Sequence, residues 1–502
     1  MRMRVTPLIL GVLAGFLAAP ALAQRSEDTL RVVWRDGVPN LDPYYNALRT
    51  GLVVANQVWD TLIYRDPETF QLKPLLASSW RYVDDTTIEF TLRPDVKFHD
   101  GSPLTADDVV YTVQVATGDE KVAVPTNYAF LAGAERVDDL RVRLKLKHVF
   151  PAALEYIAVT LPILPRAYRE RAGAGFSEQP VGSGPYKITE VDGISSITLD
   201  RNDDYFGGPK GKPAIKRVYI REVTDPVDEI AAITDGSADW IWQFSPDEID
   251  DLSRRPELQV MRQESMRLNY MALDAAGRTG GGNPLTDQKV RQAVMMAVDR
   301  DALSHRYMPG SRVLDAPCYP TQFGCDQAEA RRYAYDPDAA RKLLADAGYP
   351  DGFQTKLVGY LQPPWQYAIK NDLAAVGIMA AVEQLPIGAA LESSMAGHNP
   401  LNLGSWGSYS INDVSAFLPV FFAGGRQDYA RDPELEKLVT AGGATTDPDQ
   451  RRASYDAAIQ RITDQAYFMP LFTDVTLYAV SRDLRFKPFA DELPRFYLTS
   501  WR

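Results

Sequence analysis

Alternation of apolar and polar residues predicts several short strands along the chain. The segment TIEFTLR places Ile88, Phe90 and Leu92 on one face, and LRVRLKLK alternates leucine and valine with arginine and lysine from Leu140 to Lys147. Successive side chains of a strand point to opposite faces, so this period of two predicts strands that are buried on one face only. We expect the basic face of the second strand to be solvated.

Between such strands lie segments with the spacing and the end signals of helices. In TADDVVYTV, Thr105 is expected to cap a helix and Asp108 to complete a capping box. In YDPDAARKLLADAGYP, Asp336 is the expected cap and Pro337 the first helical residue. DPDQRRASYDAAIQRI repeats that arrangement from Asp447. Strands that alternate with capped helices predict an α/β fold rather than a helical bundle or a β-sandwich.

The N-terminal segment 1–23 has the pattern of a secretory leader. Arg2 and Arg4 precede an apolar run that ends in Ala21-Leu22-Ala23, and basic, apolar and small residues in this order are typical of a signal peptide. We expect cleavage after Ala23. The next residue is Gln24 and not the cysteine that a lipid anchor requires, so we predict a periplasmic protein that is not a lipoprotein.

Length, charge and cysteine content limit the classes of protein that the chain can form. Its 502 residues, 45% of them apolar, exceed what one core usually organises, so we expect two or three structural units. Asp and Glu outnumber Lys and Arg by 66 to 54, which argues against nucleic acid as a partner. We expect Cys318 and Cys325 to form a disulfide in an oxidising compartment, and we expect no metal site.

The motifs of common enzymes are missing from the sequence. There is no G-x-S-x-G serine, no H-E-x-x-H zinc helix, and no histidine close to either cysteine. GGPKGKP has Pro213 where a phosphate loop needs serine or threonine. Adjacent acids such as Asp84-Asp85 stay open as acid/base residues, although acids at turns are usually solvated. We therefore expect a binding protein without a cofactor, and not an enzyme.

Two further motifs are interpreted first as structural. In VKFHDGSPL, Asp100-Gly101 signals a turn, and we expect His99 to hydrogen-bond within that turn. In PVGSGPY, Gly182 and Gly184 allow a backbone path that other residues would resist. A direct role of this segment in ligand binding is the alternative.

Taken together and in this order, the motifs resemble a known family. PLLASSW and TIEFTLRPDVKFHDGSPLTADDVVYT span 74–112, PVGSGPYKI and LDRNDDYFGGP follow, and ITDGSADW, LNYMALD, DQKVRQAVMMAVDR, YDPDAARKLLADAGY and SWGSYSINDVSAFL complete the series. The chain resembles the extracytoplasmic solute-binding proteins of ATP-driven oligopeptide, dipeptide and nickel importers, called solute-binding family 5. The resemblance covers essentially the whole chain after the leader.

The resemblance implies a two-lobed periplasmic-binding-protein fold of type II, similar to cluster C, with an additional domain inserted in the first lobe. Lobe 1 would comprise residues 24–58, 183–274 and 478–502, the inserted domain 59–182, and lobe 2 residues 275–477. A ligand that contacts both lobes would stabilise the closed form by its extra affinity for that form.

The resemblance also implies the function. The protein would be the substrate-binding component of an ABC importer, would capture a peptide or peptide-like solute, and would deliver it as a monomer to the membrane permease. An opine, a saccharide or a metal chelate is the alternative ligand. A hydrolase, a sensor and a folding helper for exported chains are less favoured alternative functions.

Family members contact their ligand from three places, which correspond here to Asn40–Thr50, Arg267–Tyr270 and Trp406–Asp413. Peptide-binding members place an aspartate three residues after the tryptophan, where it pairs with the ligand's amine, but this chain has Tyr409 there. Asp413 lies nearby, shifted by one extra residue before Phe417. Trp406 would form a pocket wall, or else belong to the core. Arg267 could pair with a ligand carboxylate or form a salt bridge between the lobes, and Arg49 is the weaker candidate for pairing with a carboxylate. The expected ligand-binding residues are Tyr45, Asn46, Arg49, Arg267, Asn269, Trp406, Tyr409, Asn412 and Asp413, with Tyr44 framing the pocket.

Overall fold

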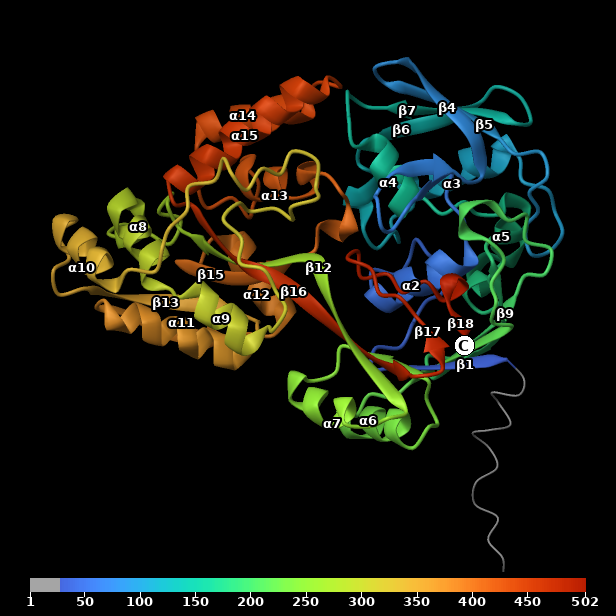
Figure 1. Ribbon diagram of the computed structural model, residues 1–502. Helices are drawn as coiled ribbons and strands as arrows, with labels where there is room; N and C mark the ends of the chain where they lie inside the picture. Colours follow the sequence, from blue (N-terminus) through green and yellow to red (C-terminus); the bar gives the residue numbers. More distant parts are fainter. Residues whose placement is uncertain (1–27) are drawn as a thin grey trace, which may run out of the picture.

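The computed structural model describes residues 28–502, so the expected leader and its cleavage site lie outside the described residues. A ten-stranded sheet runs through the molecule in the order β14-β13-β15-β12-β16-β11-β1-β10-β9-β8. Its two halves belong to different bodies of the molecule (Figure 1). The strands are β1 (Thr29–Trp34), β8 (Tyr186–Asp192), β9 (Ser196–Arg201), β10 (Arg217–Glu222), β11 (Trp240–Trp242), β12 (Leu258–Leu273), β13 (Phe353–Gly359), β14 (Ile378–Gln384), β15 (Leu401–Trp406) and β16 (Phe468–Ser481).

The strands β12 and β16 join the two halves. They pair antiparallel from Leu258↔Ser481 to Ala272↔Phe468, with a break in register between Glu264 and Leu268. Figure 1 shows them running diagonally from one body to the other. This arrangement is the two-lobed α/β fold of type II binding proteins. The positions of the domain boundaries given above stay predictions.

Helices cover the half of the sheet formed by β13, β14 and β15. Two of the predicted caps are present: the side chain of Asp336 accepts from the backbone N–H of Ala339, and Asp447 accepts from that of Asp449. Helix N-terminal N–H groups lack partners within the helix, so such caps fix where each helix begins. The helices are α8 (Gln288–Ala297), α9 (Arg300–Tyr307), α10 (Pro337–Asp346), α11 (Pro363–Ala375), α12 (Ile387–Ala396), α13 (Leu418–Phe422), α14 (Pro433–Gly443) and α15 (Pro448–Asp464).

A separate four-stranded sheet of order β4-β5-β7-β6 forms the third body. Ile88, Phe90 and Val142 are fully buried, as the alternation predicts. On the other face Arg143 donates to Glu89 at 2.8 Å, so part of the basic stripe is neutralised by the sheet's own carboxylates. The elements are β2 (Ile63–Arg65), β3 (Leu72–Pro74), β4 (Ala77–Asp84), β5 (Thr87–Leu92), β6 (Leu131–Arg136), β7 (Arg141–Leu146), α3 (Ala106–Gly118), α4 (Ala153–Thr160) and α5 (Arg166–Ala172).

The remaining elements surround the first half of the large sheet. They are α2 (Arg49–Val58), α6 (Pro226–Thr234), α7 (Ile249–Ser253), β17 (Leu484–Arg485) and β18 (Ser500–Trp501). Within residues 28–502, no helix combines the length and the apolar character needed to cross a bilayer. A disulfide joins Cys318 to Cys325, with their Cα atoms 5.8 Å apart.

The glycines of PVGSGPY lie where two backbone segments meet. A Cβ at Gly182 would come within 2.1 Å of the Val58 carbonyl oxygen, and the N–H of Gly184 donates to that oxygen at 2.8 Å. His99 bonds to the same segment: its Nδ1 accepts from Gly182 N at 3.1 Å and its Nε2 lies 3.0 Å from the Gly184 oxygen. The structural interpretation of His99 holds, but its partners are these glycines and not the 98–102 turn.

This geometry predicts an acid-sensitive contribution of His99 to stability. Nδ1 accepts a hydrogen bond, so the ring must be neutral, and burial lowers the pKa of His99 to about 4 from its usual value near 6.5. The stability that His99 contributes is complete above pH 6.5 and is lost as the pH falls from there towards 4, because only the unfolded chain takes up the proton in that range. Urea unfolding at several pH values should show that His99→Asn loses less free energy of unfolding between pH 6.5 and 4.5 than the wild type does. The same change at the exposed His305 should leave the wild-type slope.

Candidate binding site

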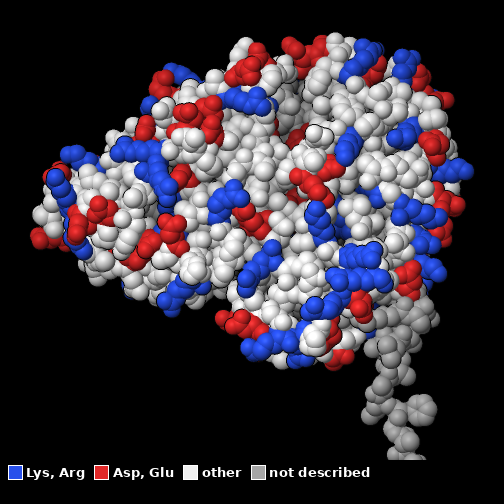
Figure 2. Space-filling model, viewed as in Figure 1, with Lys and Arg blue, Asp and Glu red and all other residues white. Residues whose placement is uncertain are grey.

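A cavity lies where α2, the body with the four-stranded sheet and the C-terminal segment meet. The space between these segments opens to solvent. Figure 2 shows a hollow in the molecular surface where the body with α14 and α15 meets the body with the four-stranded sheet, and neither of these two helices contributes a residue to the lining of the cavity. The lining comes from the 43–47 loop, α2, segment 59–65, segment 124–128, segment 158–162, Lys210, Tyr409, Leu493 and Arg495.

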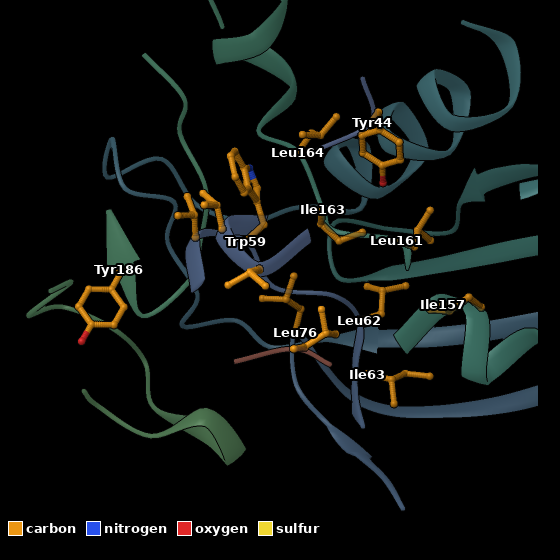
Figure 3. Packing of buried hydrophobic residues seen from close by; sticks show 14 of the residues in the cluster. Tyr44, Trp59, Leu62, Ile63, Leu76, Ile157, Leu161, Ile163, Leu164 and Tyr186 are labelled. Atoms are coloured by element: carbon orange, nitrogen blue, oxygen red, sulfur yellow. The ribbon is translucent and has the colours of Figure 1, made fainter. Parts of the chain in front are cut away.

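Aromatic rings held from behind form the apolar part of the lining. Tyr44 and Trp59 belong to the buried cluster that also contains Leu161 and Ile163 (Figure 3). The Tyr44 hydroxyl donates to the Pro162 carbonyl oxygen at 2.8 Å, and Trp59 Nε1 donates to the Val181 oxygen at 3.0 Å. With their polar atoms satisfied and their rings packed, these side chains form a rigid wall.

A buried group of charges lies beside this wall. Asp491 accepts from Arg65 at 2.9 Å and bidentately from Arg495 at 2.9 and 2.7 Å. Arg65 also pairs with Glu155 and donates to the backbone oxygen of Ser410. Burial alone would raise the pKa of Asp491, but the guanidiniums of Arg495 and Arg65 hold it at about 2. These ion pairs and hydrogen bonds therefore connect three segments that are distant in sequence, 59–65, 408–410 and 491–495.

Glu492, the next residue, occupies the space between two arginines. Arg267 donates to both of its oxygens at 3.2 Å, and Arg49 Nη2 lies 3.0 Å from Oε2. These two guanidiniums hold the pKa of Glu492 at about 2 against the effect of burial. Its φ of +58° is a strained value for a residue with a Cβ, and such strain often accompanies functional segments.

Three of the predicted ligand-binding residues line the cavity, and Tyr44 lies with them. Asn46 is held locally, since its Nδ2 donates to the Asn40 oxygen at 2.9 Å and its Oδ1 accepts from Leu48 N at 2.7 Å. Arg49 extends from the first turn of α2. Tyr409 has a left-handed φ of +49°, and burial raises the pKa of its hydroxyl.

Other predicted residues lie outside this cavity. Tyr45 donates to Asp119 and its ring lies under Arg169, 5.2 Å from the guanidinium carbon. Trp406 donates through Nε1 to the Ala416 oxygen at 3.0 Å, and its ring meets the edge of Tyr409. Asn269 is 1% exposed, and among the described residues its Nδ2 has no acceptor. Arg267 is paired with Glu492, as described above.

The disulfide loop and Arg451 hold the last two predicted residues, Asn412 and Asp413. Phe323 N donates to the Asn412 oxygen at 3.0 Å, and Arg451 Nη2 donates to both carboxylate oxygens of Asp413 at 3.0 and 2.8 Å. Arg451 also stacks on Phe323, with 4.3 Å between its central carbon and the ring centre. The carboxylate of Asp413 is therefore already neutralised within the protein.

Several residues of the site escaped the sequence prediction. Lys210 lies in the segment rejected as a phosphate loop, and its Nζ contacts Asp60 at 2.8 Å and the Asn56 oxygen at 2.7 Å. Arg65, Asp491, Glu492 and Arg495 carry no local motif. For Asp491, Glu492 and Arg495 the sequence signal is the run DELPR, a cluster of charges near the C-terminus between apolar residues. Among residues 28–502, no group of three or more His, Cys, Asp or Glu side chains is arranged to hold a metal ion.

Two lobes joined by crossing strands, with a cavity lined from several segments, define a binding protein. Residues 71–429 match the family described as bacterial extracellular solute-binding proteins, family 5. The chain belongs to this family, as its motifs indicated.

Individual relatives agree with this assignment. The glutathione-binding protein GsiB of Salmonella paratyphi A is 26% identical over 495 residues, covering 95% of this chain and 94% of the relative. The dipeptide-binding protein of Pseudoalteromonas sp. SM9913, solved with Met-Leu, has a TM-score of 0.77 at 22% identity, covering 94% of this chain and all of its own. AgaA of A. tumefaciens R10, solved with agropinic acid, has a TM-score of 0.75 at 24% identity, covering 94% of this chain and 99% of its own.

Proposed function

We propose that this protein is the periplasmic substrate-binding component of an ABC importer, and that it takes up a short peptide or a peptide-like solute and passes it to the permease. The cavity carries the proposal, since it offers aromatic walls and a few fixed polar groups, which is the usual composition of a small-molecule site. Relatives named for glutathione and for dipeptides support this ligand class.

Closure of the lobes around the ligand would give the transporter a conformation that it can distinguish from the empty protein. Tyr409 follows β15, in the body opposite α2, yet it lines the same cavity as Arg49. A solute that contacts both residues favours the closed form by the difference between its affinities for the two forms. Asn46, Arg49 and Tyr409 are the proposed first contacts. Tyr45, Arg267, Asn269, Trp406, Asn412 and Asp413 stay predictions for a ligand that extends towards β12 and β15.

A carboxylic acid that is not a peptide is the second candidate ligand. Tyr409 favours it, because the aspartate that would pair with a peptide amine is replaced there, and Asp413 is bound to Arg451 instead. A relative of the same fold was solved with agropinic acid.

Native mass spectrometry of the protein purified from the periplasm of its host tests the proposed function. Denaturing release should yield a peptide or an amino-acid conjugate, and adding that compound at about 100 times its Kd should stabilise the fold by about 2.7 kcal/mol. A protein that is empty, and whose melting temperature is unchanged by peptides, opines, sugars and metal chelates, would remove the assignment.

A further inference from the structure

We propose that the solute is an anion whose acid group binds against the cationic wall of this cavity, and that the site needs no free amine on its ligand. This inference rests on the proposed function and narrows its ligand class. The chemical class is a small carboxylic acid, such as an N-blocked peptide or an amino-acid conjugate.

The first argument is the sign of the charges that line the cavity. Its lining contains four cationic side chains, Arg49, Arg65, Lys210 and Arg495, and among the described residues no Asp or Glu side chain. The carboxylates that pair with these cations are Asp60, Glu155, Asp491 and Glu492, and none of them is part of the lining. A ligand therefore meets the positive ends of the ion pairs, where an acceptor or an anion is favoured.

The second argument is the set of buried donors that remain unused. Arg65 and Arg495 are buried, and within the described chain the Nε of each has no hydrogen-bond acceptor. An unpaired N–H in a buried guanidinium is costly, and natural proteins leave few of them. Lys210 differs, because its ammonium is already used by Asp60 and by the Asn56 and Trp59 oxygens. Both Nε atoms are buried in this form, so an acid group would reach them only if the side chains shifted. What the two arginines present to the cavity is their positive charge.

The third argument concerns the most accessible cation. The Arg49 side chain is 18% exposed, against 3% for Arg65 and Arg495. Its Nη1 makes only a 3.1 Å bond to Ser410 Oγ and a 3.5 Å contact to the Asp491 oxygen, while Nη2 faces Glu492. Arg49 can thus turn part of its guanidinium towards a ligand without losing its buried carboxylate, which makes it the first contact for the acid group.

The fourth argument is the opposite side of the cavity. Tyr409 is the contribution of segment 275–477 to the lining, and its side chain is neutral. A cationic amine would therefore find cations on one side and no carboxylate on the other. Electrostatics favour an acid without an amine, tolerate a zwitterion, and disfavour a cation.

Four forms of one dipeptide test the charge preference at nearly constant shape: N-acetyl-Ala-Phe, N-acetyl-Ala-Phe amide, Ala-Phe and Ala-Phe amide. By isothermal titration calorimetry the N-acetyl acid should bind at least about tenfold more tightly than its amide, and Ala-Phe amide should bind most weakly. Equal affinity of the acid and amide forms would overturn the inference and leave the proposed function intact. If none of the four binds, the same comparison of acid and amide forms is made with the compound released from the native protein, and a released compound without an acid group would overturn the inference.

Variants locate the acid group. Arg49→Gln should weaken binding of the N-acetyl acid about tenfold more than it weakens binding of the N-acetyl amide. The surface change Arg255→Gln controls for loss of net charge. Tyr409→Asp should weaken binding of the N-acetyl acid and strengthen binding of Ala-Phe amide. Circular dichroism should first show that Arg49→Gln and Arg267→Gln are both folded. If Arg267→Gln then loses more affinity for the N-acetyl acid than Arg49→Gln does, the acid group lies at β12 and the proposal is overturned.

Discussion

Asp491→Asn is expected to lower the free energy of unfolding by about 3–5 kcal/mol, because it leaves two buried guanidiniums without their shared carboxylate. Asp491 is 0% exposed and accepts two bonds from Arg495 and one from Arg65. Asparagine keeps the size of the side chain, so the loss reports charge rather than packing. Chemical denaturation at pH 7 measures it.

The control and the pH dependence make this prediction specific. Glu170→Gln removes an exposed partner of Arg166 and should cost no more than about 1 kcal/mol. The pKa of Asp491 is about 2 in the folded protein and near 3.8 otherwise, so its stabilisation is complete above pH 4 and is lost as the pH falls towards 2. The gap between wild type and Asp491→Asn should therefore narrow in that range. A constant gap from pH 7 to pH 2 would show that charge is not its source.

The sequence was informative wherever the physical cause is local. Alternation placed Ile88 and Phe90 in a buried face. An aspartate directly before a proline identified Asp336 and Asp447 as helix caps. These features depend on neighbours within one turn or one strand, which a single sequence records directly. The family resemblance then indicated the fold. It also named Asn46, Arg49 and Tyr409 as ligand-binding candidates, and these three residues line the cavity.

The charges of the site could not be predicted in this way. Arg65 and Asp491 are 426 residues apart in sequence, and Arg267 and Glu492 are 225 apart. No periodicity links such positions; only the packing of the C-terminal segment against α2 and β2 does. Asp413 shows the converse: it is close in sequence to the expected amine anchor, yet Arg451, 38 residues away, takes its carboxylate.

Gly182→Ala is expected to destabilise the protein by about 1–3 kcal/mol, because the added methyl group meets backbone rather than a mobile side chain. Its Cβ would lie 2.1 Å from the Val58 oxygen and 3.1 Å from Trp59 Cδ1. Trp59 lines the cavity, so relief of the clash should displace the ring and weaken ligand binding as well as stability.

Gly175→Ala is the matched control, since a Cβ there meets nothing within 4 Å and Gly175 lies in a short 3₁₀ helix. It should be neutral or slightly stabilising, because alanine restricts the unfolded chain more than glycine does. Urea unfolding and titration with the native ligand measure both effects. If Gly182→Ala were as stable as Gly175→Ala, Val58 and Trp59 would move aside at little energetic cost. The PVGSGPY segment would then not be the rigid connection that holds α2 beside the cavity.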